Sequence, residues 1–301
     1  MSKKISRSSE GTHIAQVFGG PWSLIKTDVV ERYLQFFNTA LKNQGFKKLY
    51  IDAFAGSGAF QYVRGPSTGD LFAYDDAEAK IHSGSAQRAL SIRPPFDEVV
   101  FIEENQDNVR ALERLIKAIG HPAVKIEHGD ANSILRDLCK SRDWNTTRGV
   151  VFLDPFGLHV EWETLKAIAA TRAFDVWYLF ALAGTVRNLP RLASQLDTSK
   201  RAAVTRVLGT DEWFGRFYNQ PQGASLFEAS PGAVRRTATI DEIEAYVRER
   251  LLTIFSLVEA PLRLKAPGNK SLFSLFFAVS NPSSRAKELA QKGASFILSK
   301  K

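Results

Sequence analysis

Apolar residues along this chain follow two patterns, one typical of helices and the other of buried strands. Helical spacing of apolar residues occurs at 22–41, 108–119, 162–170 and 283–298. Short, nearly continuous apolar runs occur at 48–54, 98–102, 124–127, 149–153 and 175–182. Because these runs are apolar along their whole length and alternate with helices, they predict a parallel sheet covered on both faces.

The last part of the chain has a different pattern. Apolar stretches at 262–265 and 271–279 flank Gly268 and Asn269, which predicts a β-hairpin. A helix follows, with Ser283 or Ser284 as its expected N-cap. Five parallel strands and a terminal hairpin predict a mostly parallel, seven-stranded, Rossmann-like α/β sheet. This is the architecture of class I S-adenosylmethionine-dependent methyltransferases, whereas dinucleotide dehydrogenases usually keep a sixth parallel strand.

This pattern divides the chain into four parts. Residues 1–19 form a flexible N-terminal lead-in, and residues 20–186 form the Rossmann-like cofactor-binding core. Residues 187–236 are a helical, basic insertion that caps a substrate or a partner. Residues 237–301 complete the core with the last helix, the hairpin and the C-terminal helix.

Composition narrows the setting and the partners. The 301 residues include one cysteine, Cys139, so no internal disulfide is possible and a reducing cytoplasm is expected. No uncharged apolar run reaches the roughly 18 residues of a membrane helix, so no membrane contact is expected. A net charge of +8 favours a DNA or RNA partner, although many basic proteins bind no nucleic acid.

Candidate chemistry lies where the strands end, because open α/β sheets bind ligands at the carboxyl ends of their strands. The first strand ends in Asp52 and a turn that contains Gly56 and Gly58. Glycines at this place let a ligand approach the backbone. Gln61 replaces the third glycine of the dinucleotide fingerprint, so a simple tight turn is the alternative to a nucleoside-type cofactor site.

The next two strand ends also carry carboxylates. Glu103 can accept hydrogen bonds from both ribose hydroxyls of a nucleoside. Asp130 can accept from an adenine amino group while the Ala131 N–H faces a ring nitrogen. The alternative for Asp130 is that it caps the following helix.

The fourth strand ends in Asp154, Pro155, Phe156 and Gly157. Methyltransferases that act on amino groups place an Asp/Asn-Pro-Pro-aromatic motif at this strand end. There the acidic or amide side chain holds the acceptor amine and the ring stacks on the base. Asp154, Pro155 and Phe156 are therefore the candidate catalytic residues. Phe156 stands one position early for stacking, and an Asp-Pro turn is the structural alternative.

Basic and aromatic residues alternate in the insertion. The basic ones that could grip phosphates are Arg187, Arg191, Lys200, Arg201 and Arg206. A solvated helical cap packed by its own aromatic rings explains the same pattern. The five histidines show no metal-ligand spacing, so no metal site is expected.

The strand-end segments YIDAFAGSG, FIEEN, HGDAN and VFLDPFG, with GSAQRAL and SLFSLFFAVSNP, resemble the three-Cys-motif partner protein family of bacteria. The likeness runs from about Trp22 to the C-terminal helix. It implies a methyltransferase-like Rossmann fold. It also implies a partner, a three-cysteine-motif protein that is itself similar to radical S-adenosylmethionine enzymes.

A looser likeness links the chain to ribosomal-RNA adenine-N6 methyltransferases, whose motifs find counterparts at Lys26, Gly84-Ser85 and Asp154. Ala86 stands where that family has proline. Together the likenesses imply S-adenosylmethionine as cofactor. The residues implied to bind it are Lys26, Asp52, Phe54, Gly56, Gly58, Ser85, Glu103, Asp130, Ala131 and Asp154.

Two functions follow as expectations. The first is methyl transfer from S-adenosylmethionine to nucleic acid, at an exocyclic amino group. The second is a non-catalytic or accessory role beside a three-cysteine, radical-enzyme-like protein in nucleic-acid modification or defence.

Overall fold

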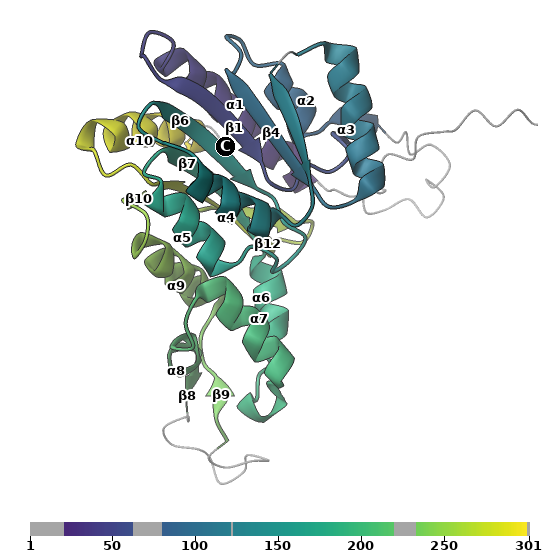
Figure 1. Ribbon diagram of the computed structural model, residues 1–301. Coiled ribbons are helices and arrows are strands. Elements are labelled where there is room, and N and C mark those ends of the chain that lie inside the picture. Colours follow the sequence, from purple (N-terminus) through teal and green to yellow (C-terminus); the bar gives the residue numbers. More distant parts are fainter. Residues whose placement is uncertain (1–20, 63–79, 122, 220–232, 300–301) are drawn as a thin grey trace, which may run out of the picture.

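The computed structural model describes residues 21–62, 80–121, 123–219 and 233–299. A central sheet has the strand order β10-β12-β7-β6-β1-β4-β5, with β11 also paired to β12 (Figure 1). Its five mutually parallel strands are β1 (Lys47–Asp52), β4 (Glu98–Glu103), β5 (Val124–His128), β6 (Thr147–Leu153) and β7 (Phe174–Phe180). The five predicted parallel strands are therefore confirmed; four of them are largely buried, whereas β5, at the edge of the sheet, has only half-buried and exposed residues.

Alternate residues of the four buried parallel strands, β1, β4, β6 and β7, pack against opposite faces. Tyr50, Phe101 and Phe152 belong to the core under one set of helices. That set is α1 (Pro21–Ala40), α2 (Ser85–Leu90), α3 (Gln106–Ile119) and α10 (Ser284–Leu298). Ile51 and Leu153 face the other set. That set includes α4 (Ala131–Ser141), α5 (Trp162–Ala170) and α9 (Ile240–Leu252). Because helices cover both faces of these strands, odd-numbered and even-numbered side chains along them are both apolar.

The predicted hairpin is β11 (Leu262–Ala266) and β12 (Lys270–Val279). Gly268 and Asn269 turn between them with φ of +80° and +62°, the left-handed region that glycine and asparagine tolerate best. β12 runs antiparallel to β7. The predicted helix follows with Ser283 at its N-cap, although the Ser283 side chain makes no capping hydrogen bond.

Five parallel strands and an antiparallel strand inserted beside the last of them define the class I S-adenosylmethionine-dependent methyltransferase fold, as the sequence predicted. The pattern did not reveal β10 (Leu257–Val258), which pairs with the end of β12 and makes the sheet eight-stranded. Two residues are too few to show a period. The predicted strand 175–182 is two residues too long, because Leu182 already begins α6 (Leu182–Asn188).

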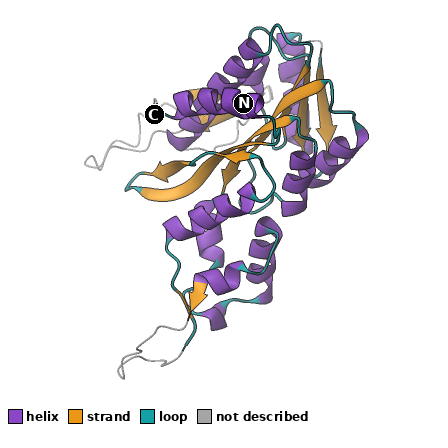
Figure 2. Ribbon diagram, turned by 90° about the vertical axis from the view of Figure 1, so that its left-hand side faces the viewer, coloured by secondary structure: helices purple, strands orange, loops and turns teal. Residues whose placement is uncertain are grey.

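The insertion forms the lower lobe in Figures 1 and 2. Beyond α6 it contains a 3-10 turn (Ala193–Gln195), α7 (Thr198–Leu208), α8 (Trp213–Phe217), β8 (Tyr218–Asn219) and β9 (Arg235–Arg236). Trp213 and Phe217 are fully buried in the same hydrophobic core as Leu153 and Phe276 of the sheet. The insertion therefore has no core separate from that of the sheet.

A second short ribbon, β2 (Ala59–Tyr62) and β3 (Lys80–Ser83), follows the glycine turn. The predicted lead-in, residues 1–19, lies outside the described residues. Among the helices that are described, none is long and apolar enough to cross a membrane.

Candidate active site

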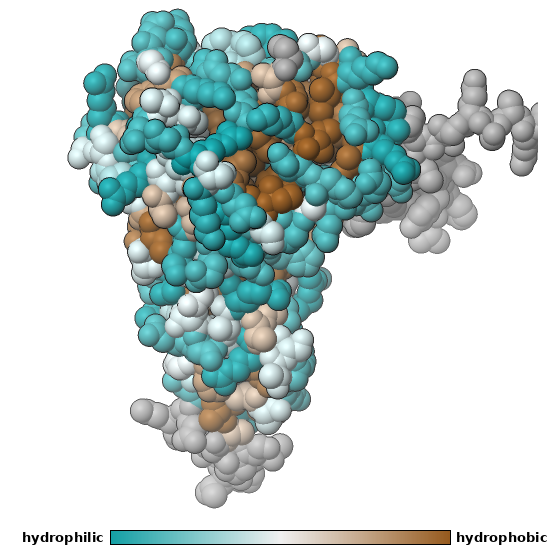
Figure 3. Space-filling view, in the orientation of Figure 1, coloured by the Kyte–Doolittle hydropathy of each residue, from teal (hydrophilic) through white to brown (hydrophobic). Residues whose placement is uncertain are grey.

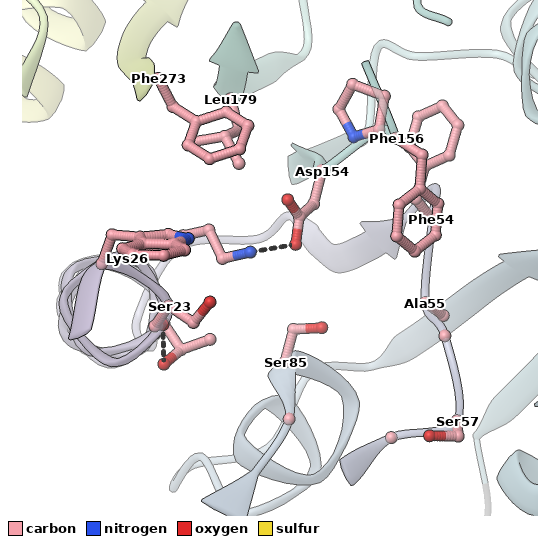
Figure 4. Close-up of a pocket in the computed structure, with 16 residues that line it drawn as sticks. Ser23, Lys26, Phe54, Ala55, Ser57, Ser85, Asp154, Phe156, Leu179 and Phe273 are labelled. Atoms are coloured by element: carbon pink, nitrogen blue, oxygen red, sulfur yellow. Dashed lines mark hydrogen bonds and ion pairs between the residues drawn. The ribbon is translucent and has the colours of Figure 1, made fainter. Parts of the chain in front are cut away.

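A cavity of about 300 Å³ opens at the carboxyl edge of the parallel strands (Figure 4). Three elements supply most of it: the first turns of α1, the glycine turn after β1, and the segment after β6. Its lining residues are Trp22, Ser23, Lys26, Thr27, Phe54, Ala55, Gly56, Ser57, Gly58, Gly84, Ser85, Asp154, Pro155, Phe156, Leu179 and Phe273. The structure thus brings the predicted residues of β1, α2 and β6 together around one space.

The glycine turn has a backbone that favours glycine. Gly56 and Gly58 have φ of +61° and +80°. A Cβ at Gly58 would lie 2.7 Å from the Leu115 side chain, so the turn packs closely on α3. A Cβ at Gly56 would meet no atom within 4 Å, so that side of the turn is open. The turn is therefore closed toward the helix and open on the side of Gly56.

Glu103, at the end of β4, supports this turn. One carboxylate oxygen accepts from the Gly56 N–H at 2.8 Å, and the other accepts from the Asn105 N–H at 2.8 Å. Glu103 does not line the cavity itself. Each carboxylate oxygen has a second lone pair, so the residue can still accept two hydroxyl hydrogen bonds.

Asp154 follows β6 and pairs with Lys26 from α1. The Lys26 ammonium donates to Asp154 Oδ2 at 2.5 Å, and the two side chains are 12% and 23% exposed. Figure 4 shows this pair at the centre of the cavity, between Phe273 and Leu179 on one side and Ser85 on the other. The ion pair joins two segments 128 residues apart and faces the open space.

Asp52 lies fully buried at the end of β1. Burial and the nearby charge of Asp154 raise the pKa of Asp52 to about 7, although Ser85 and Lys26 act in the opposite direction. The Tyr50 hydroxyl donates to Oδ2 at 3.4 Å, whereas Oδ1 has no hydrogen-bond partner among the residues that the structure describes. Asp52 is therefore a carboxyl group that gains a proton readily near neutral pH.

Asp130 and Ala131 do not line the cavity. Asp130 is the N-cap of α4, and its carboxylate accepts from the Ser133 N–H at 2.8 Å. The capping alternative is thus what the structure shows for its side chain. Ala131 begins the same helix and is buried. Their role toward a cofactor stays a prediction.

The Asp-Pro-Phe segment lies at the rim. Pro155 is buried, and the Phe156 ring is 60% exposed. Figure 4 shows Phe54 and Phe156 beside each other, next to Asp154. An exposed ring at the mouth of a cavity offers an apolar face to a flat ligand.

Sequence reasoning did not single out Ala55 and Ser57 within the predicted glycine turn, and outside the predicted motifs it missed five lining residues: Trp22, Ser23, Thr27, Leu179 and Phe273. Trp22 and Lys26 are four residues apart, so a helix places them on one face, and that spacing could have indicated Trp22. Leu179 and Phe273 have no such signal, because only strand pairing brings β7 and β12 to the cavity.

The predicted nucleic-acid residues lie in the lower lobe. Lys200 pairs with Asp197 at 2.6 Å, and Arg201 pairs with Asp211 at 3.4 Å. Arg206 donates to the Leu158 carbonyl at 3.4 Å. Within the described part of the chain, no ion pair involves Arg187 or Arg191. Figure 3 shows mostly hydrophilic residues on the visible face of this lobe.

The strand order defines a methyltransferase-like α/β fold. No protein-family model and no curated protein matches its sequence. Among solved structures it is similar to protein LPL1258 from Legionella pneumophila, assigned to family DUF519, with 15% identity, 92% of each chain covered and a TM-score of 0.47.

Two further structures are similar to the chain. One is the N-terminal domain of EvdMO1, solved with S-adenosylhomocysteine and D-fucose (13% identity, 91% of this chain and 88% of that one, TM-score 0.42). The other is the bifunctional kinase-methyltransferase WbdD (12% identity, 91% of this chain and 45% of that one, TM-score 0.44). Identities this low do not carry a ligand or a substrate from one protein to another. No group of three metal-ligating side chains occurs among the residues described.

Proposed function

We propose that this protein is an S-adenosylmethionine-dependent methyltransferase that acts on an amino nitrogen of a nucleic acid. The observation that carries the proposal is that Asp154 and the Gly56 turn border the same cavity. A cofactor-binding turn and an acceptor-holding carboxylate must be neighbours for a methyl group to pass between them.

The residues on the cofactor side fit a nucleoside. The open side of Gly56 leaves room for a ligand against the backbone, and Glu103 keeps two lone pairs for ribose hydroxyls. Asp130 and Ala131, at the next strand end, would complete the adenine side. When bound here, S-adenosylmethionine would supply an electrophilic methyl group.

The residues on the acceptor side need only hold and orient the amino group. Asp154 would accept a hydrogen bond from the amino group, and the Pro155 carbonyl could accept a second one. Both bonds would orient the nitrogen lone pair toward the methyl carbon. Alignment supplies most of the catalysis, because the nitrogen then needs no strong base.

The nucleic-acid part of the proposal is supported by charge and position. The chain carries a net charge of +8. The insertion begins at the end of α6, the helix that follows β7 at the carboxyl edge of the sheet, which is also the edge of the cavity. Within the insertion, the Arg201 guanidinium lies 5.0 Å from the centre of the Phe214 ring, so a basic and an aromatic side chain that could contact nucleic acid lie together.

One observation favours a second candidate function. Lys26 already occupies the Asp154 carboxylate that should hold the acceptor amine. A protein that has this fold but catalyses no methyl transfer would suit the role of an accessory partner of a three-cysteine, radical-enzyme-like protein.

Isothermal titration calorimetry with S-adenosylmethionine and S-adenosylhomocysteine tests the cofactor site. We expect a Kd in the micromolar range, about −8 kcal/mol, and a loss of at least tenfold in Glu103→Ala. Glu104→Ala removes the same charge from the neighbouring residue and should bind normally. Equal affinity of both variants, or no binding at millimolar ligand, would overturn the cofactor assignment.

Transfer of a radiolabelled methyl group to total RNA, DNA and protein then separates the two candidates. Label in nucleic acid supports the methyltransferase. Cofactor binding with no label in any acceptor would instead support the accessory role.

A further inference from the structure

The cavity contains a small and balanced set of charges. Of its lining residues, only Lys26 and Asp154 are charged, and each neutralises the other. The remaining polar groups of the lining side chains are the Trp22 indole N–H and the hydroxyls of Ser23, Thr27, Ser57 and Ser85. Thr27 already donates to the Ser23 carbonyl within α1. An acceptor group that enters this space therefore meets the ion pair as its main polar feature.

The ion pair is not saturated by its own contact. A lysine ammonium has three N–H donors, and one of them points at Asp154 Oδ2. The second oxygen, Oδ1, lies on the cavity side in Figure 4, between the Lys26 end and the Leu179 and Phe273 side chains. The pair thus presents a hydrogen-bond donor and a hydrogen-bond acceptor next to each other.

We propose that Lys26 and Asp154 together recognise an amidine edge, in which an N–H donor stands beside an acceptor nitrogen. Asp154 Oδ1 accepts from the amino group, and Lys26 donates to the neighbouring ring nitrogen. Adenine offers this edge through N6 and N1, and cytosine through N4 and N3. Lys26 is then a specificity-determining residue, and its pairing with Asp154 is the resting form of the recognition site.

The same arrangement rejects other amines. A lysine side chain or a polyamine offers no acceptor atom to Lys26, and it brings a second positive charge beside the first. A glutamine carboxamide has both a donor and an acceptor, but it lacks a wide flat surface. The rings of Phe54, Phe156 and Phe273 around the cavity favour a planar base over a carboxamide.

This inference rests on the proposed function, so the experiment must distinguish a failure of the inference from a failure of that function. The probes are short single strands with one central adenine or 1-deazaadenine, flanked by abasic nucleotides. Both keep the exocyclic amine, but 1-deazaadenine lacks the N1 acceptor. Binding is measured by fluorescence anisotropy at saturating S-adenosylhomocysteine, whose own binding is confirmed for every variant.

We expect wild-type protein to bind the adenine strand about tenfold more tightly than the 1-deazaadenine strand, as one charge-assisted hydrogen bond implies. Lys26→Met should reduce that ratio to within about twofold. Lys166→Met, which removes an exposed lysine paired with Glu163 on α5, should keep the tenfold ratio. Because both strands are measured on the same variant, a general loss of folded protein or of positive charge weakens both affinities alike and leaves their ratio unchanged.

Equal binding of the two strands by the wild-type protein would overturn the inference, as would an unchanged ratio in Lys26→Met. No strand binding, or methylation of a glutamine peptide in place of the adenine strand, would overturn the inference together with the nucleic-acid substrate of the proposed function. Failure of S-adenosylhomocysteine to bind would instead count against the proposed function, and the two failures are therefore distinguishable.

Discussion

Two carboxylates lie at opposite edges of the sheet and differ in how many of their oxygens have partners. Glu98 begins β4, and Asp154 follows β6. Both Glu98 oxygens are occupied: Arg142 donates to each, Lys125 lies 3.2 Å from Oε1, and Lys47 lies 2.7 Å from Oε2. Among the described residues, Asp154 has one cationic partner, Lys26, on one of its two oxygens.

A structural carboxylate has hydrogen-bond and ionic partners on both of its oxygens, whereas a carboxylate that can bind a ligand keeps one oxygen without such a partner. Glu98 is only 5% exposed. Burial alone would raise its pKa, but hydrogen bonds from Arg142, Lys47 and Lys125 outweigh burial and lower the pKa of Glu98 to about 2. Nothing further can approach it. Asp154 keeps an open oxygen in a cavity, so the carboxyl edge of the sheet can bind and the amino edge holds strands together.

The largest effect should come from removing the open carboxylate. Asp154→Ala should lower the rate of methyl transfer at least 100-fold, because the acceptor amine loses the group that orients it. The melting temperature should change by about 2 °C or less, since the Lys26 pair is partly exposed. Initial rates and thermal unfolding check both parts. A melting temperature lowered by 10 °C would make Asp154 a structural residue like Glu98.

Glu98→Ala should have the opposite profile. It should lower the free energy of unfolding by about 3 kcal/mol, because three cations lose their common partner at a buried site. Folded Glu98→Ala should keep wild-type methyl transfer within twofold. Urea unfolding measures the loss, and Glu127→Ala on the exposed side of β5 serves as control.

The contribution of Glu98 to the free energy of unfolding should depend on pH over a defined range. Its pKa is lowered from 4.5 to about 2 in the folded protein, so its contribution is complete above pH 4.5 and disappears as the pH falls toward 2. The stability difference between wild type and Glu98→Gln should shrink over that interval. A constant difference from pH 6 to pH 2 would contradict the assignment.

The sequence could predict the fold and half of the cavity because both depend on local patterns. Apolar runs predicted the five parallel strands, and the strand ends predicted Gly56, Gly58 and Asp154, which line the cavity, and Glu103, which lies behind the glycine turn. The missed residues depend on long-range packing. Phe273 enters the cavity only because β12 pairs with β7, and the pairing of Lys26 with Asp154 spans 128 positions.

The capping of α4 by Asp130 shows a second limit. A carboxylate at a strand end serves equally well as helix cap and as ligand acceptor, and the residue type does not decide between them. The strong saturation of Glu98 was also invisible in the sequence, because its partners come from three separate segments.

Asp52→Asn tests how a fully buried carboxyl group at the carboxyl edge affects the pH dependence of stability. The pKa of Asp52 is raised from 3.8 to about 7, so the folded state favours the protonated form. Wild-type stability should therefore fall as the pH rises from about 4 to about 7, by at most about 1.4 kcal/mol per pH unit for this group. Asp52→Asn should remove that part of the slope, measured by urea unfolding at several pH values.

Asp175 provides an internal reference for that measurement. Burial also raises its pKa to about 7, so it adds a slope of the same sign that remains in Asp52→Asn. The Asp52→Asn and Asp175→Asn variants should each lose part of the slope. An Asp52→Asn variant with the full wild-type slope would mean that Asp52 stays ionised in the fold.

The smallest expected effects come from two glycines, one at each edge of the sheet. Gly56 borders the cavity, and Gly120 caps α3 at the edge that holds Glu98. Their φ values are +61° and +71°, and a Cβ on either would meet no atom within 4 Å. Alanine at either site should therefore cost about 1 kcal/mol of stability, through backbone strain alone. Only Gly56→Ala should also weaken S-adenosylhomocysteine binding, by about threefold to tenfold in calorimetry, because its methyl group enters the space left for the ligand. Equal affinity of the two variants would place the cofactor away from this turn, and the contrast between the two edges would then rest on Asp154 alone.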